Sequence, residues 1–123
     1  MKAVCKVILL AMVALTLACA GASPELKNVD LNLWKADHMG CEGHRQEFEQ
    51  PLLDQKDQLL GLSEMEIVSV LGKPDVNELY KRNQKFYFYF LEPGGTCENA
   101  LPSARKLSIR FNAMGLAKEI AVE

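Results

Sequence analysis

The 123-residue sequence predicts an α+β fold, in which two helices pack on one face of a small antiparallel sheet of three to four strands, in ααβββ order. Helix-forming residues and a helix cap lie in the middle of the chain, whereas apolar residues alternate with period two only after residue 74. A tight turn joins the last two alternating segments, as in an antiparallel hairpin. Helices first and strands afterwards are typical of this fold class.

The chain opens with a pattern typical of export. Lys2 and Lys6 form a basic start, and residues 7–17 are apolar apart from Thr16. This run is shorter than the roughly 20 residues that a transmembrane helix needs, but it fits the apolar part of a secretory signal. We therefore expect residues 1–18 to be a signal peptide of the lipoprotein type.

The end of this leader indicates how the mature protein begins. Leu15-Thr16-Leu17-Ala18-Cys19 resembles a bacterial lipobox, in which Cys19 becomes the acylated first residue, although an aliphatic residue is usual in place of Thr16. An ordinary cleavage site at Ala18-Cys19-Ala20, with plain secretion, is the alternative. We expect residues 19–33 to form a lipid anchor and flexible tether, and residues 34–123 a single domain. The acyl chains would hold the protein on a membrane without a spanning helix.

Cysteines Cys41 and Cys97 remain in the expected domain. In an exported protein, two remaining cysteines most often form one disulfide. A Cys41–Cys97 bridge would close a loop of about 57 residues and stabilise the fold by roughly 4 kcal/mol in the chain-entropy model. The alternatives are two free thiols, or a zinc site that adds His38 and His44 at an H-x2-C-x2-H spacing.

A first helix is expected over residues 44–60, which are rich in Gln, Glu, Leu and Lys. Pro51 cannot donate a backbone hydrogen bond, so we expect the helix to kink there or to restart with Pro51 in its first turn. Gly61 ends it. Before this helix, residues 28–34 do not distinguish an extended segment from a helix start, and residues 37–43 are typical of a loop fixed by Cys41.

The second helix, Glu64–Leu71, carries the clearest signals. Ser63 and Glu66 form a capping box, in which each side chain accepts a hydrogen bond from a free amide of the first turn. Gly72 and Pro74 end the helix. Because the helix is short, packing rather than intrinsic propensity must stabilise it.

Period-two alternation predicts the strands. Residues 76–80 are expected to form a short edge strand, residues 85–91 an aromatic strand, and residues 107–111 and 116–122 a hairpin with its turn at 112–115. We expect a bulge near Lys118, which shares the parity of its apolar neighbours. With helices on one face of the sheet, the expected core residues are Phe86, Phe88, Phe90, Leu107, Ile109 and Phe111.

A family resemblance rests on three motifs: Gly61-Leu62-Ser63-Glu64-Met65-Glu66-Ile67-Val68 leading to Leu71-Gly72-Lys73-Pro74-Asp75, the aromatic strand, and the Phe111-Asn112-x-x-Gly115-Leu116 hairpin. Together they resemble the BamE-like (SmpA/OmlA) small outer-membrane lipoproteins over about residues 59–122. Residues 34–58 do not match the family pattern. The resemblance implies two helices followed by a three-stranded sheet, a fold shared with β-lactamase inhibitory proteins. It also implies a non-enzymatic scaffold at the outer membrane, in its best-known members assisting β-barrel assembly.

The sequence contains no pattern typical of catalysis: no Gly-x-Ser-x-Gly, no phosphate-binding loop and no His-Glu-x-x-His. About 90 residues also leave little room for a pocket that separates two carboxyl pKa values. We expect no enzymatic activity, no cofactor and no bound metal. Without Lys2 and Lys6, the formal charge of 12 basic minus 16 acidic side chains is −4, which excludes nucleic-acid binding driven by phosphate neutralisation.

Charge is unevenly distributed, at −5 over residues 42–66 and +4 over residues 79–110. Both segments can simply be solvated faces. A sharper hypothesis is that Lys81, Arg82 and Lys106 face anionic headgroups or an acidic partner, since a lipid anchor would already hold them near a membrane.

If the phenylalanines face inward, Tyr87 and Tyr89 lie on the uncovered face beside Arg110. Exposed tyrosine and arginine are typical of protein-binding hot spots, although tyrosine also favours strands. We expect an envelope-protein partner on this face, with the barrel-assembly machinery as one candidate, and the domain in the periplasm at the outer membrane. The alternative is a soluble periplasmic or secreted inhibitor or ligand-binding module on the same fold.

Overall fold

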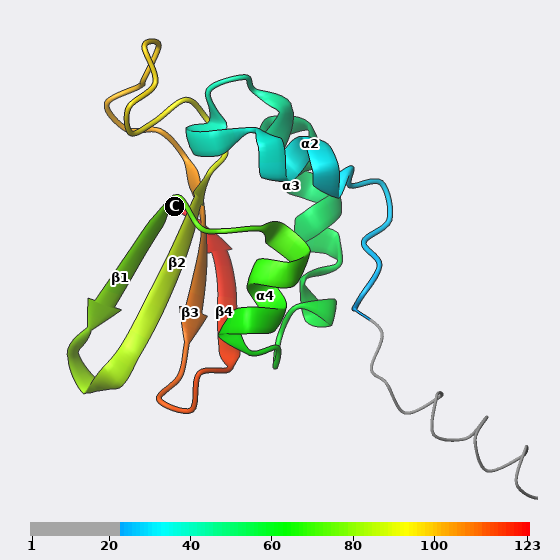
Figure 1. Ribbon diagram of the computed structural model, residues 1–123, viewed down its shortest axis with the longest axis vertical. Helices are drawn as coiled ribbons and strands as arrows, with labels where there is room; N and C mark the ends of the chain where they lie inside the picture. Colours follow the sequence, from blue (N-terminus) through cyan, green and yellow to red (C-terminus); the bar gives the residue numbers. More distant parts are fainter. Residues whose placement is uncertain (1–22) are drawn as a thin grey trace, which may run out of the picture.

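The computed structural model describes residues 23–123, in which helices precede strands and cover one side of a single sheet (Figure 1). The expected signal peptide and the expected lipidation site Cys19 lie outside the described residues. The α+β prediction is confirmed, with an additional short helix at the start. The elements are α2 (Leu31–Ala36), η1 (His38–Gly40), α3 (His44–Asp54), η2 (Lys56–Gln58), α4 (Glu64–Leu71), β1 (Val76–Tyr80), η3 (Lys81–Asn83), β2 (Gln84–Phe90), β3 (Lys106–Phe111) and β4 (Ala117–Val122).

The folded part begins earlier than expected. The carboxylate of Asp30 caps α2 by accepting hydrogen bonds from the amides of Asn32 and Leu33. Leu26 belongs to the core and is only 8% exposed. A tether that runs to residue 33 is therefore too long, because the chain already packs against the domain at Leu26.

Helix α3 continues through Pro51 and ends at Asp54, so the expected restart at the proline does not occur. The missing amide affects only the penultimate turn, and the helix stops three residues later. The side chain of Gln55 then donates to the Pro51 carbonyl. The expected extension of one helix to residue 60 is replaced by the separate 3-10 turn η2.

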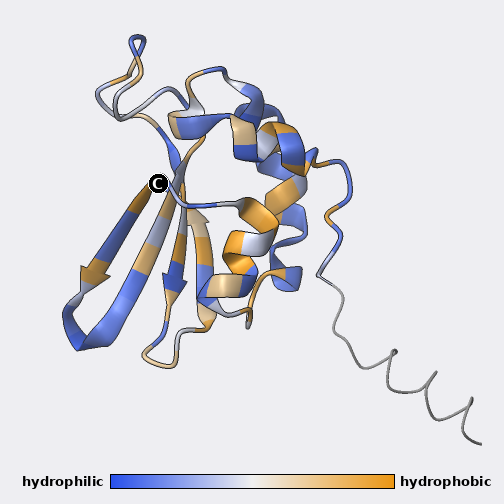
Figure 2. Ribbon diagram, in the orientation of Figure 1, coloured by the Kyte–Doolittle hydropathy of each residue, from blue (hydrophilic) through white to orange (hydrophobic). Residues whose placement is uncertain are grey.

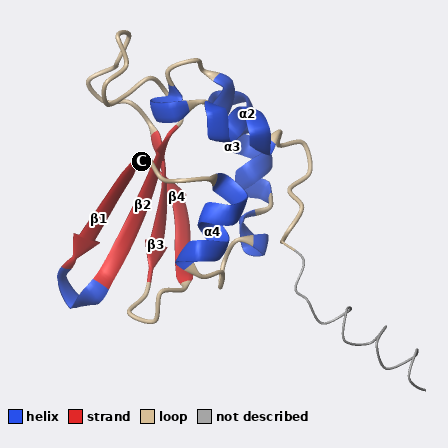
Figure 3. Cartoon of the chain, in the orientation of Figure 1, coloured by secondary structure: helices blue, strands red, loops and turns tan. Residues whose placement is uncertain are grey.

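Helix α4 is confirmed with its capping box. The Glu66 amide donates to Ser63 Oγ at 3.2 Å, and the Ser63 amide donates to Glu66 Oε1 at 3.4 Å. Ile67, Val70 and Leu71 form its buried face. Figure 2 shows this helix as mostly hydrophobic, and Figure 3 shows that all three α-helices lie on the same side of the strands.

The sheet is an antiparallel meander in the order β1-β2-β3-β4. Between β3 and β4, Arg110 pairs with Glu119 and Phe111 with Ala117, so Lys118 has no counterpart. This confirms the expected bulge. The prediction that Leu107, Ile109 and Phe111 are core residues is also confirmed, since none is more than 1% exposed.

The orientation of β2, however, is opposite to the prediction. Tyr87 and Tyr89 pair with Ile109 and Leu107, face the helices, and are 7% and 0% exposed. The phenylalanines of β2 therefore lie on the other face of the sheet. Expecting Phe86, Phe88 and Phe90 in the helix-covered core was wrong, because both faces of this strand are aromatic and the tyrosine hydroxyls find partners on the helix side.

Candidate functional site

The sheet face opposite the helices carries an aromatic strip, which we define as Tyr80, Phe86 and Phe88. The Tyr80 and Phe86 rings meet edge to face at 4.8 Å between centroids, and Phe86 stacks on Phe88 at 5.9 Å. Tyr80 is 52% exposed, Phe86 is half-buried, and Phe88 is 3% exposed. The strip thus runs from an exposed ring near the end of β1 to a covered ring in the middle of β2.

Two cations from β3 border this aromatic strip. Lys106 Nζ lies 4.3 Å from the centroid of the Phe88 ring, a favourable cation–π geometry. Arg110 is opposite Phe86 in the strand register, and its Nη2 lies 3.4 Å from Glu119 Oε2. Aromatic rings beside arginine and lysine on a sheet face without a helical layer suit contact with another protein.

The hypothesis that Tyr87 and Tyr89 form a binding face is wrong, because both rings are buried. The Tyr89 hydroxyl donates to the Gly72 carbonyl at 2.8 Å, which ties β2 to the end of α4. The Tyr87 hydroxyl donates to Glu64 Oε1 at 3.2 Å. The pKa of both hydroxyls is raised above the usual 10.0, mainly because the hydroxyls are buried. Arg110 does lie on the uncovered face, but it neighbours Phe86 instead of a tyrosine.

The three basic residues expected to face a membrane are not gathered at one place. Lys81 and Arg82 lie in the turn between β1 and β2, which Figure 2 shows as strongly hydrophilic. Lys106 pairs with Phe90 at the opposite end of β2, a strand of seven residues. At about 3.3 Å per residue, roughly 20 Å separates the two locations. Whether either location meets a membrane stays a prediction.

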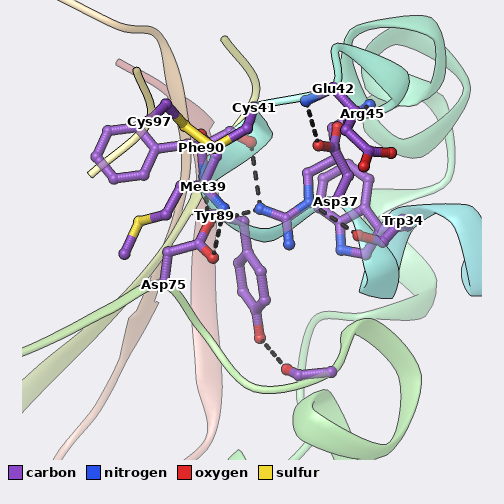
Figure 4. Close-up of polar contacts among 11 residues, drawn as sticks. Trp34, Asp37, Met39, Cys41, Glu42, Arg45, Asp75, Tyr89, Phe90 and Cys97 are labelled. Atoms are coloured by element: carbon purple, nitrogen blue, oxygen red, sulfur yellow. Dashed lines mark hydrogen bonds and ion pairs between the residues drawn. A yellow bond between two sulfur atoms is a disulfide. The ribbon is translucent and has the colours of Figure 1, made fainter. Parts of the chain in front are cut away.

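The most deeply buried ion pair among the described residues lies inside the domain (Figure 4). Arg45 Nη1 is 2.5 Å from Asp75 Oδ2, and the two side chains are 1% and 2% exposed. The guanidinium also donates to the carbonyls of Trp34 and Phe90. Asp75 in turn accepts from the amides of Met39 and Phe90. One ion pair thus connects α2, α3, η1 and the sheet.

Further contacts complete this buried network. The Asp37 carboxylate accepts from the amides of Glu42 and Arg45, which fixes the start of α3. The Arg45 guanidinium carbon lies 5.1 Å from the Trp34 ring centroid and 5.8 Å from that of Tyr89. Because the side chains of Arg45 and Asp75 are almost fully buried and Asp37 is 1% exposed, we interpret the network as a structural brace. No sequence signal distinguished these charged residues from surface ones.

Beside the brace, Cys41 and Cys97 form the expected disulfide, with their Cα atoms 5.5 Å apart. It attaches the long loop after β2 to the segment before α3. Both sulfur atoms are engaged, so neither the zinc alternative nor the free-thiol alternative describes this structure. His44 Nε2 instead lies 3.4 Å from Glu42 Oε2 at the surface. Within residues 23–123, no group of three or more His, Cys, Asp or Glu could hold a metal ion.

Two surface hollows lie within residues 23–123 on the helical side of the domain. A hollow of about 640 Å³ lies between residues 27–28 and the end of α3 and is lined largely by amide and carboxylate side chains. Another, of about 420 Å³, lies beside Met65, Val68 and Tyr87. Neither places a nucleophile next to a base. The aromatic strip is thus the best candidate for recognition.

Across the part of the chain that the structure describes, no helix is long and apolar enough to cross a membrane. No family model, curated protein or solved structure matches the chain.

Proposed function

We propose that the chain is a non-enzymatic, lipid-anchored cell-envelope protein that acts as a scaffold or adaptor at the outer membrane, with its domain in the periplasm. The apolar leader and the lipobox-like sequence that ends at Cys19 support the anchor. The Cys41–Cys97 disulfide supports an oxidising compartment.

The observation that carries the adaptor role is the aromatic strip on the uncovered sheet face. Tyr80 and Phe86 present ring surface to solvent, while Lys106 and Arg110 stand beside the strip. Rigid rings lose little conformational entropy on binding, and the adjacent cations help to orient the bound partner. The brace and the disulfide hold the sheet and the helices in one arrangement, which favours a preformed binding face.

For the partner, the resemblance to BamE-like lipoproteins supports an envelope protein, with the barrel-assembly machinery as the specific proposal. The resemblance rests on the capped helix ending in Leu71-Gly72-Lys73-Pro74 and on the closing hairpin. A secreted inhibitor or ligand-binding module on the same fold remains the alternative, and it would use the same aromatic strip.

The test is purification of the tagged protein from its own membranes in mild detergent, with mass spectrometry of the co-purifying proteins. Tyr80→Ala combined with Phe86→Ala should remove the partner while the melting temperature changes little, because Tyr80 is exposed and Phe86 only half-buried. The matched control is Met65→Ala with Val68→Ala, two exposed apolar side chains on α4, on the other side of the sheet. Equal partner recovery from all three proteins would refute the assignment of the binding face.

Metabolic labelling with a fatty acid separates the anchor from plain secretion. Acyl label that is lost in Cys19→Ser supports the lipoprotein. A soluble, unlabelled periplasmic product would instead favour the inhibitor or ligand-binding module. Recovery of barrel-assembly proteins, lost only in the strip variant, would support the specific partner.

A further inference from the structure

The two edges of the sheet differ in how they are protected. At β4, the bulge at Lys118 interrupts the regular ladder, and Lys118 and Glu119 are exposed. Such devices discourage pairing with another chain. At β1, the register with β2 is regular over all five residues, Val76–Tyr80, and the strand contains no proline, lysine or bulge. The free edge of β1 is thus open to a further strand.

The helices also leave β1 uncovered. Figure 3 shows β1 as the strand farthest from the helical layer. On its helix-side face, Leu79 is 68% exposed, although residues of β2 to β4 on this face form the core. On the other face, Tyr80 begins the aromatic strip. An added strand could therefore bury apolar surface on both sides of the sheet.

The charges of β1 indicate which strand fits. Glu78 lies within the strand, whereas Lys81 and Arg82 follow its end and form no ion pair within the described part of the chain. Two copies in antiparallel orientation bring the acidic part of each strand to the basic end of the other. A parallel pair would place like charges together. The strand is thus complementary to itself, as a two-fold symmetric interface requires.

The register follows from the same charges. With Leu79 opposite Leu79 of the second copy, Glu78 of each copy lies opposite Tyr80 of the other and diagonally near its basic turn. A register centred on Glu78 would instead place two carboxylates opposite each other, which is unfavourable. The Leu79-centred register buries the two leucines together and joins the two aromatic strips.

We propose that two copies of this chain pair antiparallel through β1, with Leu79 at the two-fold axis, to form one continuous sheet from the four strands of each copy. Two five-residue strands bury less than the roughly 1,200 Å² of stable interfaces, so the dimer is a weak one. If the proposed lipid anchor is present, confinement to a membrane raises the effective concentration and favours the dimer. The pairing itself does not depend on the anchor.

The test uses the chain from Ala20 onward, since the core and the disulfide lie entirely within residues 26–122. Sedimentation velocity from micromolar to millimolar protein should show a reversible shift from monomer to dimer. Glu78→Lys alone, and Lys81→Glu with Arg82→Glu, should each abolish this shift through like-charge repulsion. An equimolar mixture of these two variants should dimerise again, because both contacts are then attractive. Lys118→Glu, on the other edge, is the matched control and should dimerise like the wild type.

Three results would overturn the proposal: a monomer at every concentration, dimerisation unaffected by the charge variants, or a charge-reversed mixture that stays monomeric. A monomer that co-sediments with phosphatidylglycerol vesicles through Lys81 and Arg82 would assign the edge to a lipid surface instead. Each readout is independent of partner capture by the aromatic strip, so failure of the dimer leaves the proposed function testable.

Discussion

Arg45 Nη1 lies 2.5 Å from Asp75 Oδ2, and the two side chains, which are 30 positions apart in the chain, are 1% and 2% exposed. Each member of the pair also makes hydrogen bonds to the backbone of other elements. These additional hydrogen bonds help to offset the unfavourable desolvation of the two buried charges. The pair joins α3, which contains Arg45, to the residue that directly precedes β1.

Replacing one member of this pair should be strongly destabilising. Arg45→Met leaves the Asp75 carboxylate buried without its cation, and we expect the free energy of unfolding to fall by about 3–5 kcal/mol. Urea denaturation measures this loss. Arg110→Met, which removes an ion pair with the exposed Glu119, is the control and should change stability by about 1 kcal/mol or less. Similar losses in both variants would contradict the role of Arg45 as a brace.

The disulfide should contribute a comparable amount. Cys41 and Cys97 are 56 positions apart, and opening a loop of that length releases about 4 kcal/mol of chain entropy in the unfolded state. We expect Cys41→Ala with Cys97→Ala to lower the free energy of unfolding by about this amount, and a reductant to lower the melting temperature of the wild type only. If the reductant also lowered the melting temperature of the double variant, another thiol would be responsible for the effect of the reductant.

The sequence predicted the order of elements well because its local signals were strong. The capping box of Ser63 and Glu66 defined α4, and the parity conflict at Lys118 located the bulge. Arg45 and Asp75 could not be recognised in this way. Their partners come from elements distant in sequence, and a charged residue in a helix is most often solvated.

The prediction of which face of β2 the helices cover was wrong for a different reason. Residues 86–90 are aromatic without exception, so alternation defines two faces but does not say which one the helices cover. The core parity of β3 could have settled it through the strand register. However, the connection over residues 91–105 is too long to fix that register from sequence. The Tyr89 hydroxyl donates to the Gly72 carbonyl, which favours the observed orientation, but this contact cannot be read from the sequence.

Two glycines next to the disulfide should respond differently to alanine. Both have a positive φ, 66° at Gly40 and 78° at Gly43, so each Gly→Ala change costs about 1–2 kcal/mol in backbone strain. At Gly40, a Cβ would also lie 2.8 Å from the Glu92 carbonyl oxygen and 2.9 Å from that of Phe90, whereas at Gly43 nothing lies within 4 Å. We expect Gly40→Ala to be about 1–3 kcal/mol more destabilising than Gly43→Ala in urea denaturation. Equal losses would mean that the η1 turn does not pack closely on the end of β2.

The buried hydroxyl of Tyr89 should make the fold sensitive to alkaline pH. Burial, as the main cause, raises its pKa well above the usual 10.0, so the folded protein retains a proton that the unfolded chain loses. Stability is therefore fully present below about pH 10 and should fall by roughly 1.4 kcal/mol per pH unit above it. Tyr89→Phe should lower stability near neutral pH by about 1 kcal/mol, because the hydrogen bond to Gly72 is lost, but should reduce the alkaline slope.

Guanidinium denaturation from about pH 8 to about pH 11 measures both effects in one series. Tyr80→Phe is the matched control. The Tyr80 ring is exposed, and its pKa is raised chiefly by the hydrogen bond to Glu78, a contact that solvent screens. This variant should therefore keep most of the wild-type slope. A slope that Tyr80→Phe reduces as much as Tyr89→Phe would mean that the Tyr89 hydroxyl is not enclosed between β2 and α4. The structural reason for placing the tyrosines inward, and the phenylalanines on the aromatic strip, would then be lost.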